Sequence, residues 1–271
     1  MDLDSSKSYI VIGDIHGCID ELKALLIQNG FKIDSRGYIT STPKSIILIG
    51  DFIDKAEDNK LKETIEFIYK NYLHLNRNKK RFYLLLGNHE KRVYEYISKS
   101  SNLKITPKTI EEEKKYYNTS LLLKQNQNLK EKFLFLYKEC YIWLRYRYKN
   151  LIVTITHAPC EERYLTKDDE VSKAKMVKCA SRSQNRGVTL DNLLPYLIKE
   201  AKDNKNIHIF GHLSQPDIRI YKNKICIDTS CIYGNTLSCA ILEKDNIRFD
   251  SVEFMNLQKP ANQKFNLLFD F

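Results

Sequence analysis

The chain has 271 residues, of which 42% are hydrophobic, and it carries a net charge of +10 with an isoelectric point near 9.1. This length supports one large domain with a sizeable core. The basic balance favours anionic partners such as nucleotides or RNA, with a Lys-rich solvated surface as an equally weighted alternative.

Membrane and disulfide-rich classes do not fit the sequence. No stretch approaches the roughly 18 apolar residues that a spanning helix needs, and the acidic, polar residues 1–6 are unlike a signal peptide. The seven cysteines are odd in number and none forms a C-x-x-C pair. We therefore expect free thiols and a cytoplasmic location.

Strands and helices alternate in the first third of the chain. Residues 8–13, 45–49 and 82–86 are continuous apolar runs, which is typical of buried parallel strands. Residues 18–29 and 58–75 carry apolar side chains at helical spacing. This order predicts a parallel sheet with right-handed crossovers and a site at the carboxyl ends of its strands.

The middle of the chain, residues 90–148, predicts a helical insert that covers one side of the site. Helical spacing occurs at 93–97, 111–123 and 129–144. The aromatic and basic stretch 141–148 favours an edge strand or part of the core of the insert over a nucleic-acid surface.

The last third predicts a second, partly antiparallel sheet. A hairpin turn is expected near Asn223 and a helix over 190–201, whereas the polar and charged stretch 160–187 shows no clear period. We expect one domain over 1–250 and a C-terminal tail over 251–271. The predicted strands are 151–156, 206–210, 218–221, 224–228 and 237–242.

Five of the predicted strands end directly in polar residues that bind metals. Four of the six histidines follow a strand, and Asp14, Asp51 and Asn88 are each 37 residues apart, about one crossover. A strand-end Asp alone is often only a helix N-cap, but five such ends together predict one dinuclear metal site. The residues are Asp14, His16, Asp51, Asn88, His89, His157 and His212.

This set of side chains indicates the metal and the reaction. Carboxylate, imidazole and amide ligands without thiolate suit Mn²⁺, Fe or Zn²⁺. Two such ions, held roughly 3.5–4 Å apart by a shared carboxylate, lower the pKa of a bridging water and hold phosphoryl oxygens. We expect the resulting hydroxide to attack phosphorus in line.

These motifs resemble a known family. The segments 13–17, 50–54, 87–90, 157–158 and 211–212 are similar to the five signature blocks of calcineurin-like metallophosphoesterases. Ser214, where a second histidine is common, resembles the phosphoprotein-phosphatase-like branch. Residues 13–22 and 227–235 look like bacterial bis(5′-nucleosyl)-tetraphosphatases and the phosphatase module of bacterial polynucleotide kinase-phosphatase. The resemblance covers about 8–99 and 150–243.

The resemblance implies an α/β fold, a four-layer α/β/β/α sandwich with a helical insert. It also implies a role for each site residue. Asp14 and His16 would bind the first metal, Asp51 would bridge both, and three residues would complete the second: Asn88, His157 and His212. His89 would be the general acid, oriented by Asp54, and an imidazole does need a carboxylate to fix its tautomer.

The phosphate-binding residues depart from the family pattern. Asp54-Lys55-Ala56 stands where Asp-Arg-Gly is usual, and Lys is a point charge whereas Arg grips two oxygens. We expect Lys55 and Asn88 to contact phosphate, and a turn with positive φ at Ala56 to be strained. Ser230 replaces a usual glycine. Among Arg163, Arg182 and Arg186, we favour Arg182 as the second phosphate ligand.

We therefore expect a phosphoesterase with two divalent ions, Mn²⁺ foremost, acting on nucleotides, dinucleoside polyphosphates or RNA ends. A phosphoprotein phosphatase is the alternative enzyme. A catalytically weakened, metal-binding regulatory module is the alternative from another class. No membrane span and no obligate protein partner are expected.

Overall fold

The computed structural model describes residues 1–98, 111, 117–179, 200–244 and 246–255. Its first sheet has the strand order β12-β11-β1-β4-β5. The predicted strands β1 (Tyr9–Ile12), β4 (Ser45–Leu48) and β5 (Phe82–Leu84) pair in parallel. The strands β11 (Thr236–Glu243) and β12 (Asn246–Glu253) extend the sheet antiparallel.

The second sheet has the order β6-β7-β8-β10-β9. Its parallel centre is β7 (Leu151–Thr156), β8 (Asn206–Phe210) and β10 (Lys224–Cys226). The edge strand β6 (Trp143–Tyr148) pairs antiparallel with β7, and the edge strand β9 (Arg219–Tyr221) pairs antiparallel with β10. The turn between β9 and β10 confirms the predicted hairpin near Asn223.

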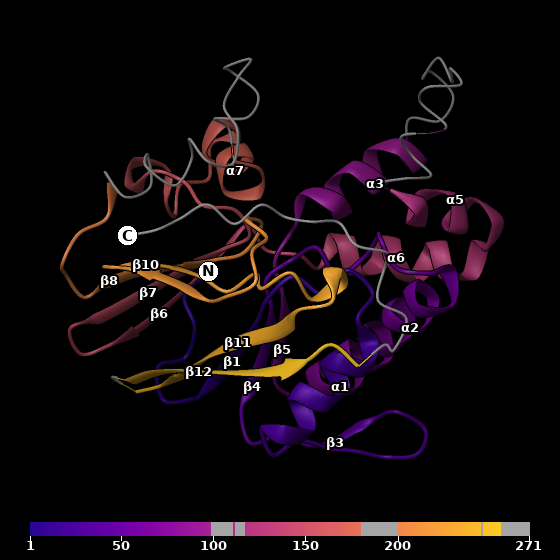
Figure 1. Cartoon of the computed structure of the whole chain (residues 1–271), viewed down its shortest axis with the longest axis horizontal. Helices are drawn as coiled ribbons and strands as arrows, with labels where there is room; N and C mark the ends of the chain where they lie inside the picture. The colour runs from indigo at the N-terminus through magenta and orange to yellow at the C-terminus, as the bar shows by residue number, and fades with distance from the viewer. Residues whose placement is uncertain (99–110, 112–116, 180–199, 245, 256–271) are drawn as a thin grey trace.

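Helices cover the outer face of the first sheet (Figure 1). They are α1 (Ile19–Gln28), α2 (Asp58–Asn76), α3 (Asn88–Ser98), α5 (Asn118–Gln125) and α6 (Gln127–Lys138). None of the helices in the described part of the chain is long and apolar enough to cross a membrane.

Shorter elements complete the described chain. The helix α7 (Glu170–Val177) lies beyond the second sheet, near the 3₁₀ turn η1 (Glu162–Tyr164). A small hairpin, β2 (Lys32–Ile33) and β3 (Ile39–Ser41), precedes β4. A second 3₁₀ turn, η2 (Cys231–Tyr233), precedes β11.

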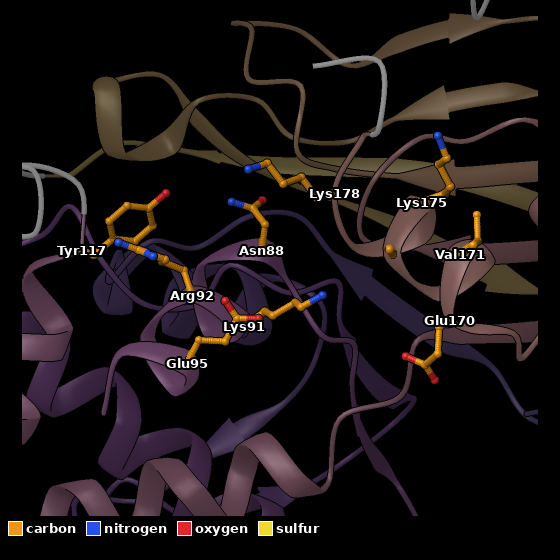
Figure 2. Close-up of a pocket in the computed structure, with 10 residues that line it drawn as sticks. Asn88, Lys91, Arg92, Glu95, Tyr117, Glu170, Val171, Lys175 and Lys178 are labelled. Atoms are coloured by element: carbon orange, nitrogen blue, oxygen red, sulfur yellow. The ribbon is translucent and has the colours of Figure 1, made fainter. Parts of the chain in front are cut away.

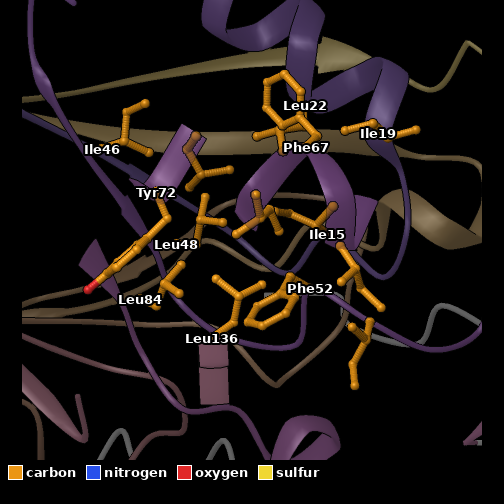
Figure 3. Packing of buried hydrophobic residues seen from close by; sticks show 14 of the residues in the cluster. Ile15, Ile19, Leu22, Ile46, Leu48, Phe52, Phe67, Tyr72, Leu84 and Leu136 are labelled. Carbon is orange, nitrogen blue, oxygen red and sulfur yellow. The ribbon is translucent and has the colours of Figure 1, made fainter. Parts of the chain in front are cut away.

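Two apolar layers hold the sheets in place. Side chains alternate along a strand, so Ile10 of β1 packs toward the helices while Val11 packs toward the second sheet. Figure 3 shows the helix-side layer, where Leu48 of β4 lies near Phe52, Phe67 of α2 and Leu136 of α6. The four-layer α/β/β/α class is confirmed.

Two predicted limits differ from the structure. The last described helix of the range 90–148 ends at Lys138, and the range closes with β6, which agrees with the edge strand favoured for 141–148. The helix α6 packs against α2 within the main core. The tail boundary at 251 falls inside β12. The predicted helix 190–201 and most of the tail lie outside the described residues.

Candidate metal centre

The carboxyl ends of five strands bring the predicted metal ligands together. Asp51 Oδ2 lies 3.7 Å from His16 Nε2 and 3.4 Å from His157 Nε2. The backbone N–H of His212 donates to Asp14 Oδ2 at 3.0 Å, which ties the ends of β8 and β1 together. We name this set the strand-end site; it comprises Asp14, His16, Asp51, Asn88, His157 and His212.

Two groups of possible ligand atoms share Asp51. One contains His16 and Asp51 together with His89, the predicted proton donor, and the other contains Asp51, His157 and His212, each with its atoms within 4.8 Å of one another. A carboxylate shared by two groups is the arrangement that a two-ion site requires.

Contacts of the Nδ1 atoms with backbone carbonyls orient the imidazoles so that Nε2 faces the site. His16 Nδ1 lies 2.8 Å from the carbonyl of Ile53, and His157 Nδ1 lies 3.1 Å from that of Ile49. A carbonyl only accepts hydrogen bonds, so each Nδ1 carries a hydrogen, and in the neutral form of each imidazole Nε2 presents a lone pair. His157 Nε2 then faces Asn88 Oδ1 at 3.0 Å, two acceptors side by side. A cation between them would relieve this repulsion.

The carboxylates also fit a cation. In the described part of the chain, Asp14 Oδ1 is buried without a hydrogen-bond partner. Burial raises the pKa of Asp14 well above its usual range, and Asp228 and Asp51 add to the rise. Burial would also raise the pKa of Asp51, but His157 and His89 lower it well below its usual range. Buried like charges with an unpaired oxygen suit a divalent ion.

Glycine makes room for these carboxylates. A Cβ on Gly87 would lie 2.2 Å from Asp51 Oδ1, and one on Gly211 would lie 2.0 Å from Asp14 Oδ1. Both contacts are far inside van der Waals distance, so the glycines that end β5 and β8 allow the backbone to approach the ligands.

His89 and Asp54 form a separate pair beside the site. His89 Nδ1 lies 2.7 Å from Asp54 Oδ2, and His89 Nε2 lies 3.9 Å from Asp51 Oδ2. The backbone N–H of Thr119 donates to Asp54 Oδ1 at 3.0 Å, and Thr119 Oγ1 accepts from the Asp54 N–H at 3.0 Å. Asp54 is therefore fixed on both sides and holds Nε2 of His89 toward the site.

A comparison with protein families agrees with this geometry. The model of the calcineurin-like phosphoesterases matches residues 8–216, about three quarters of the chain. The chain belongs to the calcineurin-like phosphoesterase family. It is therefore a hydrolase, a metallophosphoesterase, and the predicted family is confirmed.

Similar proteins share most of their length with this metallophosphoesterase. The asymmetrical bis(5′-nucleosyl)-tetraphosphatase PrpE of Oceanobacillus iheyensis is 28% identical over 247 residues, 91% of this chain and 90% of the relative. The protein of the same name from Bacillus mycoides is 25% identical, covering 85% and 88%.

Solved structures support the fold. A protein described as a candidate diadenosine tetraphosphatase superposes with a TM-score of 0.57 at 18% identity, covering 94% of this chain and 98% of that chain. A cold-active protein-tyrosine phosphatase of a psychrophilic Shewanella species superposes with a TM-score of 0.58 at 17% identity, covering 92% and 80%.

In this metallophosphoesterase, Lys55 contacts His16, one of the predicted metal ligands. Lys55 Nζ lies 2.9 Å from His16 Nε2, so the ammonium donates to the lone pair that faces the site. Lys55 also lies 5.2 Å over the ring of Tyr233. Ala56 does not have a positive φ, so the strain expected for such a turn does not arise there; Asp54 (67°) and Lys55 (71°) are the left-handed residues of this turn. Ser230, at the usual glycine position, has a φ of 61°.

The candidate arginines are not seen at the site. Arg182 and Arg186 lie outside the described residues. Arg163 is on η1, where it is exposed and forms an ion pair with Glu161 at 2.5 Å.

Three residues that support the site were not predicted from the sequence. Glu90 is fully buried, and its carboxylate accepts the backbone N–H groups of Asp51, Phe52 and Gly87 at 2.8, 2.9 and 3.0 Å. Its place directly after Asn88-His89 was a usable signal. Thr119 and Asn118, which accepts the Lys55 N–H at 3.0 Å, carry no local pattern that points to the site.

Proposed function

We propose that this chain hydrolyses phosphoanhydride bonds of dinucleoside polyphosphates, with phosphomonoesters as smaller substrates. The proposal is supported by the tetraphosphatase relatives, which match 91% and 85% of the chain, and by the basic composition. The observation that carries the reaction is the His89–Asp54 pair at 2.7 Å beside the strand-end site.

Each residue group has a distinct task in this proposal. The strand-end site would hold two divalent ions, Mn²⁺ foremost, which when bound supply a nucleophilic water and neutralise phosphoryl charge. Asp54 keeps a hydrogen on Nδ1 of His89, so that Nε2 is the nitrogen that delivers a proton to the leaving oxygen. Asn88 and Lys55 lie at the site, where they can contact the phosphoryl oxygens.

A cytoplasmic location is part of the same proposal. None of the seven cysteines forms a disulfide, and six of them are buried. Free thiols are the usual state in a reducing compartment.

The test is hydrolysis of diadenosine tetraphosphate, p-nitrophenyl phosphate, end-phosphorylated RNA and phosphopeptides with Mn²⁺ added. His89→Ala is expected to lower kcat by about 10²–10⁴-fold with the bound metal content unchanged, the usual contribution of a general acid. His74→Ala, a change at an exposed histidine of α2, is the control.

Each outcome bears on a different part of the proposal. Full activity of His89→Ala would contradict the general-acid assignment. Turnover of phosphopeptides alone would favour the phosphoprotein phosphatase. Two bound metals without turnover of any substrate would favour the regulatory module.

A further inference from the structure

A groove opens from the strand-end site between α3 and α7. It has a volume of about 570 Å³ and reaches Asn88 at one end (Figure 2). This volume falls in the range of pockets that take a drug-sized ligand. It exceeds what a single phosphoryl group requires, so the groove has room for more of a substrate than the group that reacts.

Positive charge dominates the groove. Its lining includes four cationic side chains, Lys91, Arg92, Lys175 and Lys178, against two acidic ones, Glu95 and Glu170. Glu170 is also engaged outside the groove, by Lys173 Nζ at 3.2 Å. In Figure 2, Lys178 of the α7 side reaches toward Asn88, and Lys91 of α3 points into the space between the helices. Such a lining suits a chain of phosphates.

Tyr117 connects the groove to the proposed general acid. Its ring centroid lies 5.1 Å from that of His89, with the planes tilted by 38°. Arg92 lies 5.4 Å over the Tyr117 ring, and both residues line the groove. A proton donor acts at the leaving oxygen, so the groove extends from the side of the site where the leaving group departs. The aromatic–guanidinium pair offers a flat surface for a nucleobase.

We propose that this groove binds the leaving group, a nucleoside polyphosphate. Lys91 and Lys178 contact its phosphates, and Tyr117 with Arg92 stacks its base. The proposal rests on the proposed function and adds the residues that favour a dinucleoside polyphosphate over a small phosphomonoester. These residues bind the substrate beyond the scissile bond, so their loss should change substrate preference and leave the metals in place.

The experiment compares two substrates of one active site. The double variant Lys91→Ala/Lys178→Ala is assayed with diadenosine tetraphosphate and with p-nitrophenyl phosphate, whose leaving group is too short to reach along the groove. We expect kcat/KM for the first substrate to fall roughly tenfold or more per lost charged contact. We expect kcat/KM for the second to stay within about twofold. The matched control is Lys130→Ala, a lysine of α6 outside the groove lining.

A second measurement keeps the groove testable if diadenosine tetraphosphate is no substrate. ATP then serves as the probe, as a competitive inhibitor of p-nitrophenyl phosphate hydrolysis. The inhibition constant should rise about tenfold or more in the double variant, and added salt should reduce the difference. A wild-type enzyme that does not cleave diadenosine tetraphosphate, with this rise intact, would contradict the proposed function and support the groove.

Two results would overturn the groove assignment. In one, the double variant binds ATP and cleaves both substrates as the wild type does. In the other, the activities toward both substrates fall equally, which would place the effect in the strand-end site. Tyr117→Leu gives an independent check, since loss of stacking should weaken ATP binding while inorganic triphosphate binds unchanged.

Discussion

Buried histidines occupy two regions of this molecule. In one region hydrogen-bond donors and acceptors are matched, and in the other acceptors are in excess. On the outer face of the second sheet, Thr156, His208 and Lys224 form what we name the outer-face cluster. Thr156 donates to the carbonyl of Ala158 at 2.7 Å and therefore accepts from His208 Nε2 at 2.8 Å. Lys224 Nζ then donates to His208 Nδ1 at 3.3 Å. Every imidazole nitrogen in this cluster has a complementary partner.

The strand-end site lacks that balance. There His157 Nε2 faces an amide oxygen, and the buried Asp14 Oδ1 has no hydrogen-bond partner among the described residues. Burial alone does not separate the two regions, because His157 and His208 are both nearly inaccessible. The excess of acceptors is what marks a cation site, whereas a closed donor–acceptor chain marks a structural histidine.

The strongest way to break this comparison is to remove the shared carboxylate. Asp51→Asn should lower kcat/KM by roughly three orders of magnitude, about 4 kcal/mol, because both ions would lose a ligand. It should also lower the Mn²⁺ content measured by elemental analysis. Lys224→Met, the matching change in the outer-face cluster, should leave kcat/KM within about twofold. Equal losses in both variants would contradict the separation of the two regions.

Glu90 tests whether the strand-end site depends on its buried support. Glu90→Gln places an amide NH₂ against backbone N–H groups that now donate to a carboxylate. We expect the free energy of unfolding in urea to fall by about 2–4 kcal/mol, since a buried donor loses its acceptor. Glu95→Gln, a partly buried position on the same helix, should cost less than about 0.5 kcal/mol. An unchanged midpoint for Glu90→Gln would disprove the support role.

A substitution of Lys55 tests directly whether the strand-end site has more hydrogen-bond acceptors than donors. Its ammonium is a protein cation on His16 Nε2, so a metal that uses this nitrogen must displace it. Lys55→Ala should bind Mn²⁺ about tenfold more tightly by isothermal titration calorimetry, a gain of about 1.4 kcal/mol. Weaker binding in this variant would show that Lys55 assists the metal.

The smallest expected effect is a pH dependence of stability that arises from the outer-face cluster. Burial, followed by the charge of Lys224, lowers the pKa of His208 well below its usual value. His208 therefore takes up a proton near pH 6.5 in the unfolded chain but stays neutral in the folded chain. The free energy of unfolding falls as the pH falls below about 6.5. Between about pH 7 and pH 5.5, urea unfolding should show a loss about 1 kcal/mol larger in the wild type than in His208→Gln, whose side chain does not titrate in this range. Parallel pH profiles would contradict this.

The strands that carry the site were predictable because their local pattern is complete. Each is a continuous apolar run followed at once by Asp, Asn or His, as at Ile10–Asp14 and Ile46–Asp51. β12 lacks a continuous apolar run and none of its residues is fully buried, although Ile247 and Phe249 alternate with polar residues and were a usable strand signal. Thr119 was missed because it meets Asp54 across 65 residues of chain. Local patterns report burial and turns, whereas such contacts arise only from the folded arrangement of α5.

The backbone of the site has a consequence for protein engineering. Among the non-glycine residues with positive φ are His16, Asp51, Asp54, Lys55 and His212, and each such residue costs about 1 kcal/mol or more. Selection has therefore accepted a less stable fold at these positions in exchange for the placement of reactive side chains. The turn residues Lys149, Lys222 and Lys244 share the left-handed conformation away from the site. A more heat-resistant enzyme is best sought by placing glycine or asparagine at those three turns and leaving the strand ends untouched.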